Sequence, residues 1–79
     1  MNTEYMLLGL YGKPSLTLKE VCAAIGMEIK TAYNKRSART FPIPMAGDPL
    51  TADVRDVAKY MDEKRISATK LLQQETAAL

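Results

Sequence analysis

The middle of the 79-residue chain collects the side chains whose chemistry suits a nucleic acid. Residues 30–45 contain no acid and four cations, which are Lys30, Lys35, Arg36 and Arg39. The net charge of the chain is +2, and residues 1–29 and 46–79 each carry −1, so the whole positive excess lies in this segment. An acid-free cluster of cations favours contact with phosphates, whereas an ordinary solvated surface mixes both signs.

The spacing of these residues predicts a helix that presents a polar face. At 3.6 residues per turn, Ile29, Ala32 and Tyr33 share an apolar face, with Arg36 one turn further along the same side. The face that points outward then carries Lys30, Thr31, Asn34 and Lys35. Such a face suits a DNA major groove, where an asparagine can read adenine and a threonine can contact a thymine methyl group or a phosphate.

A second helix must position this face, and the sequence predicts it over residues 18–25. Thr17 and Glu20 have the spacing of a capping box, and Leu16 and Val21 that of a hydrophobic staple. Gly26 follows as the residue that ends the helix with a positive φ, and the basic helix begins near Glu28. Two helices joined by so tight a turn predict either a DNA-binding helix-turn-helix or a purely structural helical hairpin.

Two short strands are predicted after the basic helix. Residues 40–45 alternate proline with apolar residues, which favours an extended edge strand, with Phe41 and Ile43 in the core. Residues 46–49 form a turn, and residues 50–52 run back as the second strand. The resulting hairpin would be the wing of a winged helix-turn-helix, with Gly47 and Asp48 in the wing.

One helix is predicted before this motif and one after it. The first starts at Asn2 or Thr3, ends at Gly12 and serves as scaffold. The last starts after the N-cap Asp53, with an apolar stripe formed by Val54, Val57, Ala58 and Met61. We therefore expect a mainly α fold with a small β-hairpin, in which three to four helices form a winged helix-turn-helix domain over residues 1–66. Residues 67–79 are either a helical extension or a flexible tail, and Ala68, Leu71 and Leu72 could contact a second subunit.

Composition excludes several classes of site. The chain has one cysteine, Cys22, and no histidine, so an internal disulfide, a zinc site and a Cys-His nucleophile are not expected. No acid–base pair or phosphate-cradling loop is present, so we expect no enzyme, no cofactor and no metal site. The absence of a long apolar run and of a signal-peptide pattern predicts a cytoplasmic protein without a membrane contact. DNA binding would associate it with the nucleoid.

Several short motifs resemble the pyocin activator family of phage-derived transcription regulators. They are Leu18-x-x-Val21-Cys22, Lys30-Thr31-Ala32, Phe41-Pro42-Ile43-Pro44 and Val54-x-Asp56-Val57-Ala58-x-Tyr60-Met61-Asp62. The central block is also similar to AlpA-type prophage regulators and small excisionases, which share a MerR-like winged helix-turn-helix. The likeness covers about residues 1–65. The residues that match the shared pattern are Glu20, Gly26, Thr31, Tyr33, Phe41, Pro42 and Pro44.

The resemblance implies a protein that binds double-stranded DNA near promoters and activates phage-derived or prophage genes. Because one domain of this size contacts only about 600–1,000 Å² of DNA, we also expect a homodimer through the C-terminal helix. RNA polymerase or a recombinase would be a further partner. Two residues depart from the pattern: Glu28 replaces the usual serine cap, and Lys35 occupies a position that is usually apolar. Three functions stay open: a sequence-specific regulator, an excisionase-like protein that bends DNA, and a protein-interaction module that uses the C-terminal helix.

Overall fold

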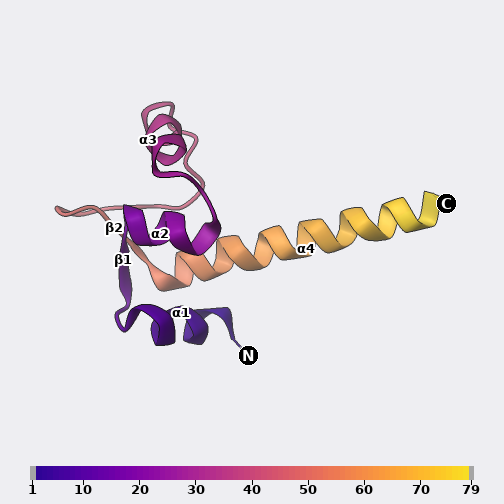
Figure 1. Ribbon diagram of the computed structural model, residues 1–79, viewed down its shortest axis with the longest axis horizontal. Coiled ribbons are helices and arrows are strands. Elements are labelled where there is room, and N and C mark those ends of the chain that lie inside the picture. The colour runs from indigo at the N-terminus through magenta and orange to yellow at the C-terminus, as the bar shows by residue number, and fades with distance from the viewer. Residues whose placement is uncertain (1, 79) are drawn as a thin grey trace.

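The chain forms four helices and one small sheet. The computed structural model describes residues 2–78, with side chains described for residues 2–74. The elements in chain order are α1 (Thr3–Tyr11), β1 (Ser15–Thr17), α2 (Leu18–Ile25), α3 (Ile29–Ser37), β2 (Thr51–Asp53) and α4 (Val54–Ala78). Figure 1 shows α1 and α2 beside the first part of α4, with α3 set apart beyond α2. The expectation of a mainly α fold with a small antiparallel pair of strands is confirmed.

The predicted ends of α1 and α2, which depend on residues close together in the sequence, are confirmed. The Asn2 side chain accepts a hydrogen bond from the Glu4 N–H at 2.8 Å, and Gly12 ends α1 with φ 70°. Thr17 and Glu20 form the capping box that starts α2, and Gly26 ends that helix with φ 73°. These positive φ values are the left-handed conformation that glycine adopts without a steric cost.

The predicted pairing of the strands is wrong. β2 pairs with β1 in antiparallel orientation, in the register Ser15–Asp53, Leu16–Ala52 and Thr17–Thr51. Residues 40–45 form no strand, because Pro42 and Pro44 lack the N–H groups that a ladder needs. The predicted hairpin is reduced to a single bridge between Ala46 and Thr51.

Two apolar clusters hold the elements together. The larger one joins α1, β1, α2, β2 and α4, and its buried residues are Leu7, Leu16, Val21, Ile43, Ala52, Val54, Val57 and Ala58. The smaller one lies under α3 and consists of Leu18, Cys22 and Ala32, with Met27, Phe41 and Met45 packed against it. Burial raises the pKa of the Cys22 thiol, which fits the predicted role of this residue as a small buried side chain.

The last helix is longer than the body that it crosses. Its 25 residues span about 37 Å, and its C-terminal end projects away from the other elements in Figure 1. α1 runs antiparallel to its first part, and the Thr3 hydroxyl donates a hydrogen bond of 2.6 Å to Asp62 Oδ1. Within residues 2–78, no helix combines the length and the apolar character that crossing a membrane requires.

Candidate nucleic-acid interface

A tight turn joins α3 to α2 and leaves α3 almost fully exposed. Residues 26–28 connect the two helices, and the Met27 N–H donates to the Cys22 carbonyl at 3.0 Å. Of the nine residues of α3, all described by the structure, only Ala32 is buried. The small side chain of Ala32 lets α3 approach Leu18 and Cys22 of α2 closely. Apart from Ala32 and the partly buried Lys35, the helix is exposed to solvent.

The six residues predicted to bind DNA all lie on α3 or directly after it. Five of them are exposed, namely Lys30, Thr31, Asn34, Arg36 and Arg39, while Lys35 is partly buried. The sequence pattern predicted that Lys35 points outward and that Arg36 points toward the domain. The structure shows the opposite, since Lys35 is partly buried and Arg36 is exposed. Both lie within one turn of Ala32, so a small rotation of the helix decides which of them faces the body.

Two residues predicted to pack in the core are exposed instead. Ile29 is 40% exposed and Tyr33 is 57% exposed. Met27, Phe41 and Met45 fill the space around Ala32, so neither residue is needed there. The prediction that Ile29 and Tyr33 pack in the core is therefore wrong.

One polar residue of the outward face was missed. At 100° per residue, Lys30, Asn34 and Ser37 lie on the side of α3 opposite Ala32, and all three are exposed. The spacing of Ser37, three residues after Asn34, could have identified it. The outward face therefore offers a cation, an amide and a hydroxyl, the groups that contact base edges and phosphates in DNA complexes.

The cations of this region are not neutralised within the protein. Among the side chains of residues 2–74, the ion pairs join Lys13 to Glu20 and Arg55 to Asp53, each at 2.9 Å. None of these pairs involves a residue of α3 or of the segment that follows it. The pairing with Arg55 lowers the pKa of Asp53 to about 2, mainly because the Arg55 side chain and backbone N–H donate hydrogen bonds to the Asp53 carboxylate. The positive charge of residues 30–39 thus remains available to an anionic partner.

The two ends of α3 differ in how well they are capped. Glu28 is the N-cap residue, but its side chain makes no capping hydrogen bond. At the other end, Arg39 has φ 59°, a left-handed conformation that non-glycine residues rarely adopt. The Arg39 N–H donates to the Arg36 carbonyl at 3.1 Å, and the Thr40 N–H to the Lys35 carbonyl at 2.8 Å. This pair of hydrogen bonds is a Schellman motif, in which glycine is the usual residue at the position of Arg39.

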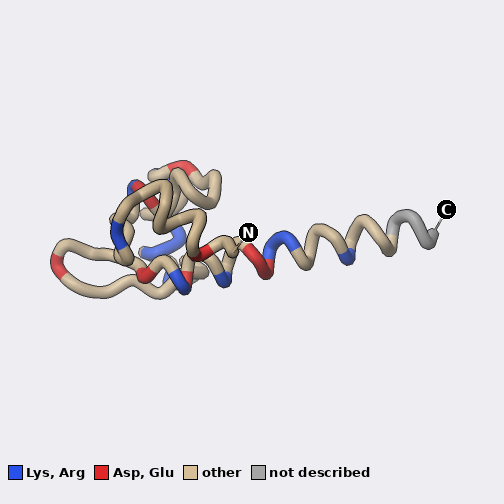
Figure 2. The backbone as a smooth tube through the Cα atoms, turned by 90° about the horizontal axis from the view of Figure 1, so that it is seen from below, with Lys and Arg blue, Asp and Glu red and all other residues tan. Residues whose placement is uncertain are grey.

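A loop projects from the body between α3 and β2. Ala46 and Thr51 close it with reciprocal backbone hydrogen bonds of 3.0 and 2.9 Å, and Gly47 turns the chain with φ 92°. Asp48 follows Gly47 in this loop and is exposed, and Figure 2 shows acidic residues in red along the backbone. A carboxylate there would repel phosphate, so this loop suits an anionic partner less well than α3 does.

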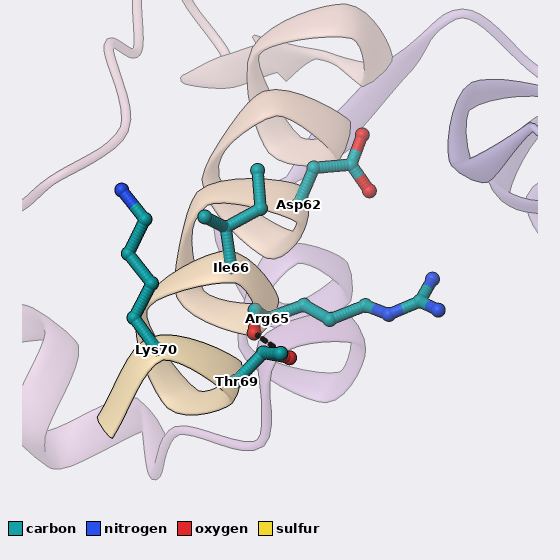
Figure 3. A pocket seen from close by; sticks show the side chains of 5 residues that line it. All are labelled: Asp62, Arg65, Ile66, Thr69 and Lys70. Carbon is teal, nitrogen blue, oxygen red and sulfur yellow. Dashed lines mark hydrogen bonds between the residues drawn. The ribbon is translucent and has the colours of Figure 1, made fainter. Parts of the chain in front are cut away.

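A separate surface lies along the outer half of α4. Figure 3 shows an open hollow lined by Asp62, Arg65, Ile66, Thr69 and Lys70, in which the Thr69 hydroxyl donates to the Arg65 carbonyl at 3.0 Å. A groove between α1 and α4 shares Asp62 and Arg65 with this hollow. Ile66, Leu71 and Leu72 are more than half exposed here, which suits contact with another protein chain.

The described residues contain no group of three or more His, Cys, Asp or Glu side chains arranged to hold a metal ion. Comparison of the chain with protein-family models, with curated proteins and with solved structures found no match.

Proposed function

We propose that the protein is a sequence-specific DNA-binding regulator of transcription, in which α2 and α3 form a helix-turn-helix and α3 enters the major groove. The observation that carries this proposal is the outward face of α3. It combines Lys30, Asn34 and Ser37, it is open to solvent, and no acid accompanies its cations between residues 29 and 45. A recognition helix needs this combination of exposure, positive charge and hydrogen-bonding side chains.

The surrounding elements support the same proposal. The Gly26 turn holds α3 against α2 through Ala32, and the loop closed by Ala46 and Thr51 would serve as the wing. Gly47 and Asp48 lie in that loop and would approach the sugar–phosphate backbone. The resemblance to the pyocin activator family suggests activation of phage-derived or prophage genes, through RNA polymerase, by a cytoplasmic protein bound to the nucleoid.

A homodimer through the outer half of α4 belongs to this proposal. One small domain contacts about 600–1,000 Å² of DNA, which is little for tight specific binding. Two copies on half-sites about 10 bp apart would place both recognition helices on one side of the duplex. The exposed apolar residues past Arg65, including Ile66 and Leu71, would form the contact between the copies.

The experiment that tests the proposal is selection of binding sites from random-sequence duplex DNA, followed by footprinting on DNA around the protein's own gene. An enriched motif and a protected promoter region would support a sequence-specific regulator. Binding without an enriched motif, together with a strong bend in the DNA, would favour the excisionase-like architectural function. No binding at low salt would refute DNA binding and leave the protein-interaction module, with α4 as its contact surface.

A further inference from the structure

Ile29 and Tyr33 lie one helical turn apart on α3 and form an exposed apolar edge. Ile29 is 40% exposed and Tyr33 is 57% exposed. At 100° per residue, Tyr33 lies about 60° from Lys30, at the border of the outward face, and Ile29 lies next to it toward the body. Thr31 lies on the opposite border. The polar outward face therefore has an apolar edge on one side only.

This edge is not explained by packing within the protein. The cluster under α3 is completed by Met27, Phe41 and Met45, which surround Ala32 without either residue. Ile29 is the first residue of α3, where the N-terminal end of a recognition helix comes closest to the bases. Two large apolar side chains thus remain exposed in the N-terminal half of α3, along one border of its outward face.

The major groove offers one large apolar group that could meet such an edge, the C5-methyl group of thymine. The other groups by which base pairs are distinguished there are hydrogen-bond donors and acceptors. The edge itself carries no charge, and the Tyr33 hydroxyl at its outer end could still reach a phosphate while the ring faces the base. The outward face of the same helix carries Asn34, which suits adenine, so the two features together would make α3 selective for A·T pairs.

We propose that Ile29 and Tyr33 form a binding site for the C5-methyl group of a thymine in the DNA recognised by α3. This inference rests on the proposed function. It assigns recognition of thymine to Ile29 and Tyr33. Thr31, on the opposite border of the outward face, would then contact a phosphate.

The test replaces each thymine of the selected binding site in turn by deoxyuridine, which removes only the methyl group. The wild-type protein is expected to bind about fourfold more weakly when the thymine beside Ile29 and Tyr33 is replaced, the effect of exposing roughly one methyl group. In Tyr33→Ser and Ile29→Ala this sensitivity should shrink toward none, measured as the ratio of affinities for the two duplexes. Tyr33→Phe should keep it, because the ring remains, and so should Thr31→Ser, which removes only the threonine methyl.

The ratio of affinities for the thymine and deoxyuridine duplexes distinguishes loss of the methyl-binding site from a general loss of DNA binding, because both affinities are measured with the same variant. Circular dichroism of Tyr33→Ser and Ile29→Ala should match the wild type, because both residues are exposed. Sequence-selective binding with no deoxyuridine effect at any position would overturn this inference and leave the proposed function intact. Sensitivity that disappears in Thr31→Ser but persists in Tyr33→Ser would move the site to the other border of α3 and also overturn it. No DNA binding at all would overturn both.

Discussion

Thr40 closes the C-terminal end of α3 on the carbonyl oxygen of Lys35. Its backbone N–H donates to this oxygen at 2.8 Å and its hydroxyl donates at 3.3 Å. This double contact fixes the path of the chain as it leaves the helix, and it forces the intervening Arg39 into a φ of 59°. An arginine is therefore held where glycine would cost less, which is understandable if its charge is needed.

Replacing Arg39 by glycine should separate stability from binding. Arg39→Gly relieves the left-handed strain and should raise the free energy of unfolding by about 1 kcal/mol. The same change should weaken DNA binding at low salt, because a phosphate contact is lost. Chemical denaturation and a filter-binding titration measure the two effects. Arg39→Gln is the matched control, which should weaken binding without the gain in stability; a glycine variant that binds as well as the wild type would remove Arg39 from the interface.

Asn34 should discriminate between specific and random DNA. Asn34→Ala is expected to cost about 1–3 kcal/mol on the selected site and much less on random duplexes, because a base-reading amide contributes only where its base is present. Competition titrations with both duplexes give the comparison. An equal loss on both duplexes would exclude base reading by Asn34.

The salt dependence of binding should report the cations of residues 30–39. If Lys30, Lys35, Arg36 and Arg39 each neutralise one phosphate, the log–log slope should be about −3.6 per subunit. Arg36→Gln should reduce its magnitude by about 0.9, since Arg36 is exposed. Lys59→Gln, at an exposed position on the first part of α4, is the control and should leave the slope unchanged. Binding that hardly responds to salt would contradict the proposed interface.

The two helix N-caps provide a further comparison. Thr17→Ala breaks the capping box of α2 and should lower the free energy of unfolding by about 1 kcal/mol. Glu28→Ser supplies α3 with the side-chain cap that it lacks, and should raise stability by about 0.5–1 kcal/mol. The serine also removes a negative charge beside the DNA, so binding should become tighter. Glu28→Gln is the control, since it removes this charge without supplying a good cap. Thermal unfolding should therefore show a higher stability for the serine variant alone.

Local features of this fold could be predicted from the sequence. The capping box at Thr17 and Glu20 and the positive φ of Gly26 depend on residues within one helical turn of each other, so their pattern is visible in the chain. The pairing of Ser15 with Asp53 joins residues far apart in the sequence, and three-residue strands carry too few side chains to reveal their partner.

The charge of the candidate site could be predicted from the sequence, but the exposure of the residues at the borders of its outward face could not. The cluster of cations between residues 30 and 39 can be counted in the sequence, whereas the exposure of Tyr33 depends on where the loop after α3 runs. That loop brings Phe41 and Met45 against Ala32, and no local pattern encodes its path. The period of the helix alone could not decide between Lys35 and Arg36, because both lie close to Ala32.

Truncation after Ile66 should test the assembly. Removal of residues 67–79 takes away Leu71 and the rest of the projecting helix, and sedimentation should then show a monomer in place of a dimer, with weaker DNA binding. Leu71→Lys in the full chain should have the same direction of effect, since it places a charge in the contact. If the truncated chain keeps its mass and its affinity, the outer part of α4 has no role in pairing.

Of the nine residues of α3 only Ala32 is buried, which has a consequence for the thermodynamics of recognition. An isolated nine-residue helix is marginal in water, and one buried methyl side chain adds little to hold it. Its amide hydrogens will therefore exchange through local openings well below the free energy of global unfolding, unlike those of α2. DNA would bind a helix that it also helps to order, so association would show a more negative heat-capacity change than rigid docking of the same surface.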